Sequence, residues 1–261
     1  MFVSKIGIQF KYLYLLMKSN VTISIFLRFM MSRFKIALKV LIKRKDSPSI
    51  RAVMEGYKAA IANKEFSNSW FDNNIPNWVK ILAPLKENNV APRICEIGSW
   101  EGRSTLFFSF YFPMSNITVI DMWSGKKDIN GVDLFKIAEQ RFDRNLMDFS
   151  DRLTKIKNNS SVAFSKLVTE GKKEFDLIYI DGSHYADNVL VDAILAWQLL
   201  AIDGTIIFDD YTHIYTPYGW SKNVAQAVNL FLRLIAGEYK IIMVSNQLIV
   251  RKLYRPIIKS R

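Results

Sequence analysis

The chain has 261 residues, half of them hydrophobic and 13% aromatic, so it can enclose a substantial core in one large domain or two small ones. Its net charge of +12 comes mainly from residues 1–45, which hold ten of the 36 Lys and Arg and no acid. Residues 46–238 carry 20 bases and 24 acids, so no nucleic-acid partner is expected. The single cysteine, Cys95, excludes an internal disulfide, lies in an apolar run where we expect it to be buried, and is consistent with a cytoplasmic protein.

Residues 1–48 are predicted to form a basic, amphipathic helical leader. The longest uncharged run, Ser19–Leu27, is far shorter than the roughly 20 residues that span a membrane. Lys35, Lys39 and Lys43 recur every four residues and therefore share one helical face. We expect this leader to lie on an anionic surface, peripherally on the inner membrane face. The alternative is a pair of helices packed on the domain, with the lysines in solvent.

Residues 49–92 are predicted to form a helical segment on the substrate side of the protein. Ile50–Asn63 and Trp78–Leu85 have the pattern of helices. Between them, Phe66–Asn77 mixes large aromatic with small polar residues. Such a segment can cover a ligand pocket as a lid, or can be an ordinary packed loop.

Residues 93–261 alternate strand-like and helical runs, which is typical of β-α units in a parallel sheet. The expected pairs of strand and helix are Ile94–Ile97 with Arg103–Phe112, Ile117–Ile120 with Leu134–Met147, Leu153–Ile156 with Ser161–Thr169, Phe175–Ile180 with Ala186–Ala201, and Thr205–Phe208 with Ser221–Ala236. Tyr239–Val244 and Gln247–Val250 then predict a hairpin around the two-residue turn Ser245-Asn246. The predicted fold is α/β, a doubly wound, mostly parallel seven-stranded sheet closed by an antiparallel hairpin, with an N-terminal helical extension.

A glycine-rich turn follows the first of these strands. Its pattern is Glu96-x-Gly98-x-x-x-Gly102-x-Ser104. A turn of this kind places a ligand at the carboxyl edge of a parallel sheet. A pyrophosphate-binding fingerprint would have glycine at the position of Trp100, which disfavours a dinucleotide. The acid before the turn suits a cationic ligand better, although an ordinary strand-turn-helix has the same outline.

The turn, the strand–helix order and the final hairpin resemble class I S-adenosylmethionine-dependent methyltransferases over roughly Trp70–Leu253. The resemblance implies S-adenosyl-L-methionine as cofactor. Asp121 ends the second strand, where an acid can bind both ribose hydroxyls, and Trp123 can lie against the adenine. Asn159 and Ser160 follow the third strand, where this fold recognises the adenine edge, but both are also ordinary turn residues. The predicted cofactor-binding residues are Glu96, Gly98, Ser99, Gly102, Ser104, Asp121, Met122, Trp123, Asn159, Ser160 and Asp181.

Two later strands end in acids, Asp181 after the fourth and Asp209-Asp210 after the fifth. Parallel strands end at the same sheet edge, so three carboxylates are expected to converge, which is costly without a cation. Oxygen ligands select a hard ion such as Mg²⁺. His184 follows Asp181 by three residues and can take a proton from a substrate hydroxyl, or simply cap the next helix.

The Asp-Gly-x-His-Tyr and Asp-Asp-Tyr segments, with Trp70-Phe71 upstream, resemble a narrower bacterial group. That group includes Mg²⁺-dependent macrolide sugar O-methyltransferases and cephalosporin-type methyltransferases. The resemblance implies that Asp181, Asp209 and Asp210 bind metal and that His184, with Asp181, is catalytic. Several relatives have Glu in the position of Asp209, and others have His there.

The predicted function is therefore O-methylation of a hydroxyl on a sugar, another polyhydroxylated small molecule or a glycan, assisted by Mg²⁺, by a protein that can form homo-oligomers. Two alternatives are a metal-independent small-molecule methyltransferase and a membrane-associated module that binds cofactor without turnover.

Overall fold

The computed structural model describes residues 21–41, 46–125, 129–171, 174–213 and 222–253. These residues fall into two compact units. The central unit comprises Arg44–Ala163, and the terminal unit combines Met1–Lys43 with Phe164–Arg261. The predicted boundaries at residues 48 and 92 stay predictions, and residues 1–20 and 42–45 of the predicted leader lie outside the described residues.

The seven-stranded sheet that the sequence predicts is confirmed. Its strand order is β3-β2-β1-β4-β5-β7-β6. Strand β2 pairs in parallel with β1 and β3, β4 pairs in parallel with β5, and β7 pairs antiparallel with β5 and β6. The antiparallel hairpin therefore follows parallel β-α units, as the alternating pattern indicates.

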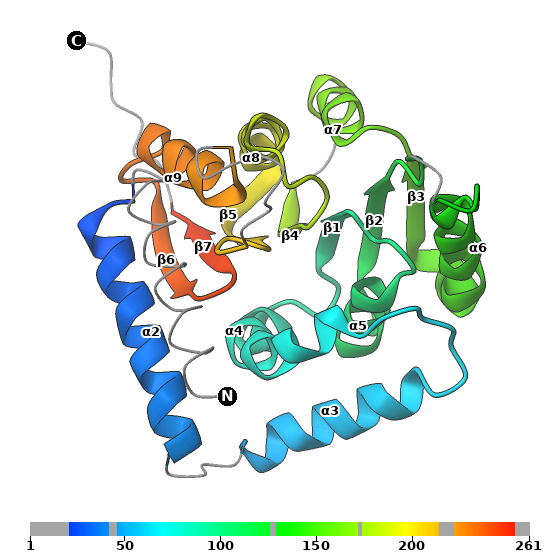
Figure 1. The fold of residues 1–261 in the computed structure, drawn as a ribbon, viewed down its shortest axis with the longest axis horizontal. Helices are drawn as coiled ribbons and strands as arrows, with labels where there is room; N and C mark the ends of the chain where they lie inside the picture. The colour runs from blue at the N-terminus through cyan, green and yellow to red at the C-terminus, as the bar shows by residue number, and fades with distance from the viewer. Residues whose placement is uncertain (1–20, 42–45, 126–128, 172–173, 214–221, 254–261) are drawn as a thin grey trace. The chain divides into compact units, whose positions relative to one another are not determined.

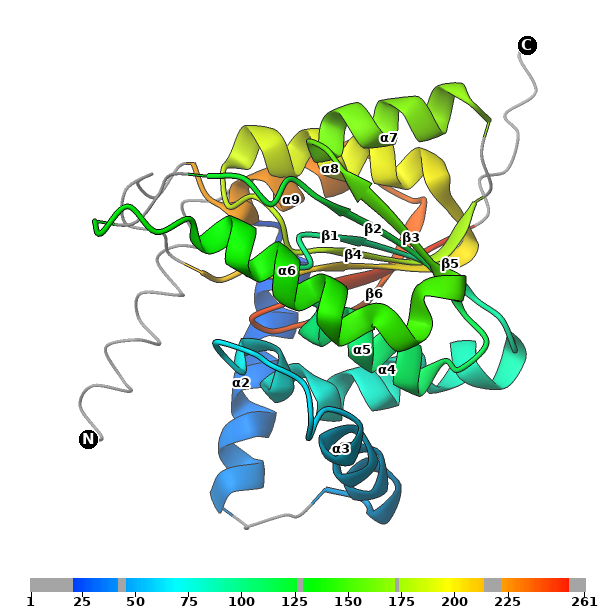
Figure 2. The same ribbon diagram turned by 90° about the vertical axis from the view of Figure 1, so that its right-hand side faces the viewer.

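The central unit begins with helices, after which three strands alternate with further helices. Its strands are β1 (Arg93–Ile97), β2 (Asn116–Asp121) and β3 (Leu153–Lys157). Its helices are α3 (Pro48–Ala60), η1 (Trp70–Asn74), α4 (Ile75–Asn88), α5 (Arg103–Tyr111), α6 (Leu134–Leu146) and η2 (Met147–Arg152). Helices α4 and α5 lie on the same side of these strands (Figure 2). Helix α7 (Ser160–Thr169) starts at the end of this unit and continues into the terminal one.

An aromatic cluster fastens the helices of the central unit to one another. The rings of Phe71 and Trp78 are 4.9 Å apart, and those of Trp78 and Phe108 are 5.0 Å apart. Tyr57 of α3 meets Phe107 of α5 edge to face at 5.5 Å. All five side chains are buried, so Phe71 of the predicted lid segment belongs to the core, whereas Trp70 of the same segment is 76% exposed.

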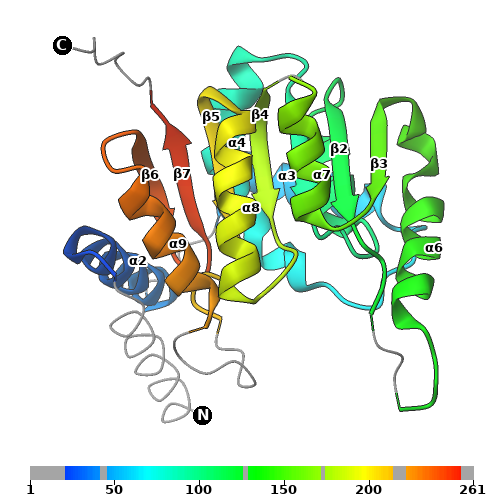
Figure 3. The same cartoon turned by 90° about the horizontal axis from the view of Figure 1, so that it is seen from above.

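The terminal unit combines the first described helix with the second half of the sheet. It holds α2 (Ile23–Leu41), β4 (Phe175–Ile180), α8 (Ala186–Leu199), β5 (Leu200–Phe208), α9 (Val224–Leu234), β6 (Tyr239–Val244) and β7 (Leu248–Lys252). Helices α8 and α9 run side by side (Figure 3). Helix α2 lies beside β6 (Figure 1). None of the described helices combines the length and the hydropathy needed to cross a bilayer.

The predicted start of β5 and the predicted length of the hairpin loop are wrong. Strand β5 begins at Leu200 rather than Thr205, because the apolar run there suits a helix end or a strand equally well. The hairpin loop has three residues rather than two, since Val244 pairs with Leu248. Gln247 stays in the loop because its carbonyl accepts a bond from the Ser245 amide and its side chain is buried.

The strands next to the predicted site are enclosed on both faces. In β1, Ile94 and Cys95 are fully buried and Ile97 is nearly so. A strand that is buried on both sides reads as a continuous apolar run, which is how the sequence identifies it. The burial expected for Cys95 is confirmed.

Candidate functional site

The glycine turn between β1 and α5 requires its two glycines for different reasons. Gly98 and Gly102 have φ angles of 82° and 80°, a left-handed conformation that favours glycine. A Cβ atom on Gly102 would lie 2.4 Å from Cδ2 of Leu146 and 3.0 Å from Cδ2 of Phe142. The second glycine therefore lets α6 approach the turn, in addition to starting α5.

Glu96 is fully buried beneath this turn. Its carboxylate accepts hydrogen bonds from the hydroxyls of Ser104 and Thr105 in the first turn of α5. Burial raises the pKa of Glu96 to about 7, although the hydroxyl groups lower it in part. Glu96 thus joins the end of β1 to the start of α5, and its predicted contact with a cofactor stays a prediction.

The side chain of Asp121, at the end of β2, binds backbone amides of the glycine turn. One carboxylate oxygen accepts hydrogen bonds from the amides of Ser99 and Trp100 at 2.9 and 3.0 Å, and the other accepts from the amide of Trp123 at 2.8 Å. Burial raises its pKa, while these amide groups lower it. A carboxylate has about four acceptor positions, so it can also receive a ligand hydroxyl.

Trp123 is closely tied to the same turn. Its indole N–H donates to the carbonyl of Trp100 at 2.8 Å, and its ring packs 4.9 Å from that of Phe142. Only 3% of Trp123 is exposed. Its ring therefore belongs to the core in this structure, and the predicted contact with adenine remains untested.

Met122 and Asn159 form the exposed part of the predicted cofactor site. Met122 is 43% exposed, and the Asn159 amide lies 3.5 Å from its sulfur. The Asn159 side-chain oxygen accepts from the amide and hydroxyl of Ser161 at 2.9 and 2.6 Å, which caps α7. Ser160 is the first residue of α7. The Asp121 carboxylate at this turn fits a cationic ligand, since opposite charge stabilises it.

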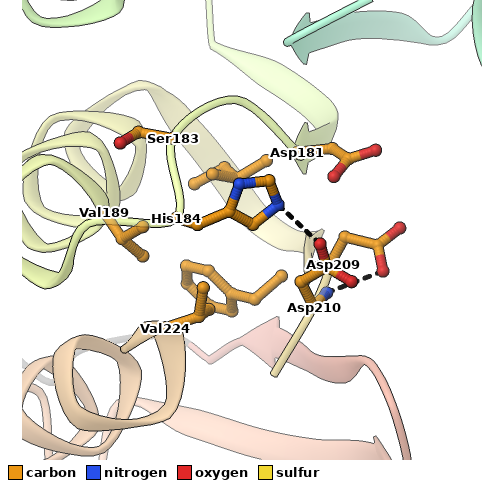
Figure 4. A pocket seen from close by; sticks show the side chains of 9 residues that line it. Asp181, Ser183, His184, Val189, Asp209, Asp210 and Val224 are labelled. Atoms are coloured by element: carbon orange, nitrogen blue, oxygen red, sulfur yellow. Dashed lines mark hydrogen bonds and ion pairs between the residues drawn. The ribbon is translucent and has the colours of Figure 1, made fainter. Parts of the chain in front are cut away.

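The acids of the terminal unit surround a small cavity (Figure 4). Asp181 follows β4, and Asp209 and Asp210 follow β5, where the Asp209 amide still donates to the Ile180 carbonyl at 3.0 Å. Asp210 has a φ of 52°, and an aspartate tolerates this left-handed conformation better than most residues. One ligand atom from each of Asp181, His184 and Asp210 lies within 4.8 Å of the others. These three residues are the candidate metal ligands that the geometry brings together.

Asp209 has a different environment from the other two acids. Its carboxylate accepts hydrogen bonds from the Tyr179 hydroxyl, from the Gln247 amide at 2.8 Å and from the Asp210 amide at 2.7 Å. Burial and the neighbouring Asp210 carboxylate raise its pKa. Tyr179 also contacts Asp181, at 2.8 Å, so it links the two acids. Among the described residues, His184 takes the place in the cluster that the sequence assigned to Asp209.

Both histidines of the chain flank Asp210. His184 Nε2 lies 2.6 Å from Asp210 Oδ2, and this contact raises the pKa of the imidazole despite partial burial. His213 Nδ1 lies 3.9 Å from Asp210 Oδ1. The sequence identified His184 as a base candidate, and the structure gives it a carboxylate partner that orients the ring.

Tyr179 and Gln247 are the site residues that the sequence analysis missed. A tyrosine inside a buried strand needs a hydrogen-bond partner for its hydroxyl, and this need was the available signal. Gln247 gave no such signal, because its side chain reaches Asp209 only through the hairpin pairing.

A larger cavity of about 650 Å³ lies in the central unit, between α3 and the start of α5. Its lining mixes apolar side chains such as Met54 and Ile75 with bases such as Arg51 and Lys58. The predicted lid segment borders it and is fastened to the glycine turn, since Asp72 forms a bidentate ion pair with Arg103 at 2.6 and 2.7 Å.

Comparison with known proteins finds a family match within the chain. Residues 95–211 match a family described as a methyltransferase domain. An uncharacterized protein of Acanthamoeba polyphaga mimivirus is 27% identical over 151 residues, which cover 55% of this chain and 61% of the viral one.

Solved structures of low sequence identity share the fold. The MycE methyltransferase of mycinamycin biosynthesis, in complex with Mg, SAH and mycinamycin VI, is 15% identical with a TM-score of 0.56, covering 80% of this chain and 56% of that one. A putative caffeoyl-CoA O-methyltransferase from Staphylococcus aureus is 16% identical with a TM-score of 0.51, covering 86% of this chain and 100% of that one. The fold that the resemblance implied is thus confirmed.

Proposed function

Since residues 95–211 carry a methyltransferase domain, we propose that the protein transfers a methyl group from S-adenosylmethionine to a hydroxyl of a sugar, another polyhydroxylated small molecule or a glycan, with help from Mg²⁺. The observation that carries this proposal is the cluster of Asp181, His184 and Asp210 at the ends of neighbouring parallel strands. The solved complex of MycE with Mg, SAH and mycinamycin VI supports the metal and the methyl donor by similarity of fold.

The donor set of the cluster fits a hard divalent ion. Asp181 and Asp210 would hold Mg²⁺ through carboxylate oxygens, which this ion prefers, and would leave positions for water or substrate. Such an ion, when bound, makes a coordinated hydroxyl more acidic. His184 is a poor ligand for Mg²⁺, so we assign it the role of general base, with Asp210 holding its ring.

The central unit would bind the methyl donor. S-adenosylmethionine, when bound, supplies an electrophilic methyl group on a positively charged sulfur. We assign its positioning to the Gly98–Gly102 turn, the Asp121 carboxylate and the exposed pair Met122 and Asn159. The three amides bonded to Asp121 hold the turn in one conformation, which lowers the cost of ordering on binding.

The test combines binding and turnover on the full-length protein. Isothermal titration calorimetry with S-adenosylhomocysteine should detect a single site, and labelled S-adenosylmethionine should transfer its methyl group to members of a panel of sugars, polyols and glycans. EDTA should abolish transfer and Mg²⁺ should restore it. Absence of any binding of S-adenosylhomocysteine would refute the proposal.

A metal-independent reaction is the second candidate, and the short contact between His184 and Asp210 favours it. A carboxylate at 2.6 Å can orient an imidazole and stabilise its protonated form without a metal. In that case EDTA leaves turnover unchanged, and calorimetry with Mg²⁺ alone detects no binding. His184→Ala abolishes transfer under both candidates, so the metal measurements decide between them.

A further inference from the structure

Helix α2 has two apolar faces, of which the protein covers only one. Ile25 and Phe29 are 0% and 1% exposed and form the face that is buried in the terminal unit, where α2 contacts β6. A second set of large apolar side chains is exposed and recurs at intervals of three and four residues, so it forms one continuous stripe. The members of this α2 stripe, with their exposed fractions, are Ile23 (79%), Leu27 (55%), Met30 (44%), Met31 (58%), Phe34 (69%) and Leu38 (43%).

Bases border the α2 stripe on both sides. At about 100° per residue, the exposed Arg28 and Lys35 fall beyond one edge of the stripe. Arg33, which is half-buried with its guanidinium 5.0 Å from the Phe29 ring centroid, falls beyond the other. The helix contains no acid, and neither does any other part of residues 1–45. An exposed apolar stripe between two basic margins is the pattern of a helix that lies in the plane of a lipid surface.

We propose that the α2 stripe docks the protein on the surface of an anionic lipid bilayer. The six apolar side chains would enter the boundary between headgroups and acyl chains, and the bordering bases would meet lipid phosphates. The face with Ile25 and Phe29 would keep its contacts with the protein, so docking requires no unfolding of α2.

Charge decides against a second copy of this chain as the occupant of the stripe. A symmetric pair of α2 helices presents the same surface twice, so the bases of one copy would border those of the other. Since α2 offers no carboxylate to neutralise them, this arrangement is repulsive. An anionic surface matches both the apolar centre and the basic margins.

Vesicle sedimentation with the full-length protein tests the proposal. The protein should partition onto vesicles of phosphatidylglycerol and phosphatidylcholine, and far less onto phosphatidylcholine alone or at high salt. Leu27→Ser and Phe34→Ser should each lower the partition coefficient about tenfold or more, because each removes a large apolar group from the lipid. Arg28→Gln and Lys35→Gln should each lower it about fivefold.

The controls replace residues of the same type elsewhere in the terminal unit. Leu234→Ser changes a leucine that is 64% exposed near the end of α9, and Lys166→Gln changes an exposed lysine of α7; both should bind vesicles like the unaltered protein. Circular dichroism should show all variants folded. Three results overturn the proposal: no binding to anionic vesicles, binding that the α2 substitutions leave intact, or a dimer in analytical ultracentrifugation that those substitutions dissociate.

Discussion

In each of the two units, single carboxylates organise the candidate residues by binding to the protein itself. Glu96 accepts from two hydroxyls of α5, and Asp121 accepts from three backbone amides. Asp209 accepts from a tyrosine, an amide side chain and a backbone amide. Residues that a motif assigns to a ligand thus also have structural roles, and substitutions at these positions will affect stability as well as binding.

The first prediction concerns the pH dependence that Glu96 gives to stability. The folded protein keeps the Glu96 proton up to about pH 7, whereas the unfolded chain releases it near pH 4.5. Folding therefore binds a proton within this window, and the stabilisation, complete below pH 4.5, is lost as the pH rises towards 7. The free energy of unfolding should fall by up to about 3 kcal/mol across the window.

Urea unfolding at several pH values, compared between the unaltered protein and Glu96→Gln, checks this contribution. The glutamine cannot titrate, so the difference between the two curves should change with pH in that window. Glu87→Gln, at an exposed position of α4, is the surface control. A difference for Glu96→Gln that does not change with pH would contradict the prediction.

The second prediction separates backbone strain from packing at the glycine turn. Gly102 and Gly131 have φ angles of 80° and 77°, but only Gly102 has side chains where a Cβ would be placed. Gly131→Ala should cost about 1 kcal/mol for the left-handed conformation. Gly102→Ala should cost about 2–4 kcal/mol, because the buried Leu146 must also move. If denaturant unfolding gave equal losses of unfolding free energy for the two substitutions, the close approach of α6 would contribute nothing to the cost of Gly102→Ala.

At the scale of elements, the segment between α3 and η1 is held by the residues on either side of Gly102. Glu101 accepts from the amide of Ser67 at 2.5 Å and pairs with Arg141 at 2.6 Å. Arg103 pairs with Asp72 and lies 4.7 Å from the Phe66 ring centroid. A change in the glycine turn is therefore transmitted directly to this segment, whose conformation the sequence left open between lid and packed loop.

The third prediction compares a buried and an exposed ion pair in this region. Glu101 is 3% exposed, whereas the side chains of Glu65 and its partner Arg144 are 64% and 61% exposed. Glu101→Gln should destabilise the protein by about 1–3 kcal/mol and speed hydrogen exchange at the Ser67 amide. Glu65→Gln should cost less than about 1 kcal/mol. Unchanged exchange at Ser67 in Glu101→Gln would show that other contacts hold the segment.

The order of elements was predictable because buried parallel strands and amphipathic helices leave different periodicities. Strand Phe175–Ile180 was predicted with its observed bounds, since it is a buried run enclosed by polar residues. The start of β5 was not, because Leu199 and Leu200 suit either element. The length of the hairpin loop was predicted wrongly because it depends on a tertiary contact. The burial of Gln247 beside Asp209 sets this length.

The candidate site was predictable to the extent that strand ends bring residues together. The clustering of Asp181 and Asp210 follows from the parallel pairing of β4 and β5. The separation of Asp209 from that cluster depends on the left-handed Asp210 and on donors from β4 and the hairpin. Those contacts arise from packing, which sequence periodicity does not encode.

At the scale of the whole molecule, the residues assigned to the methyl donor lie mainly in the central unit, and the candidate metal ligands lie in the terminal unit. Our fourth prediction uses this division. Asp210→Asn should leave the affinity for S-adenosylhomocysteine within about threefold, while turnover falls roughly 100-fold or more, since the base loses its orienting partner.

Calorimetry and methyl-transfer assays on the same preparations measure the two effects. Asp187→Asn, at an exposed position in the first turn of α8, should change neither quantity. A parallel loss of binding and turnover in Asp210→Asn would mean that the two groups of residues do not act separately.

The enclosure of Cys95 in β1 has a practical consequence for labelling. Since it is the only cysteine in the chain and is 0% exposed, maleimide reagents should find no accessible thiol in the folded protein. A cysteine introduced at an exposed position then becomes the sole point of attachment for a fluorophore or spin label. Leu27→Cys would place such a label on α2, and Val90→Cys would place one in the central unit, without any need to remove the native cysteine.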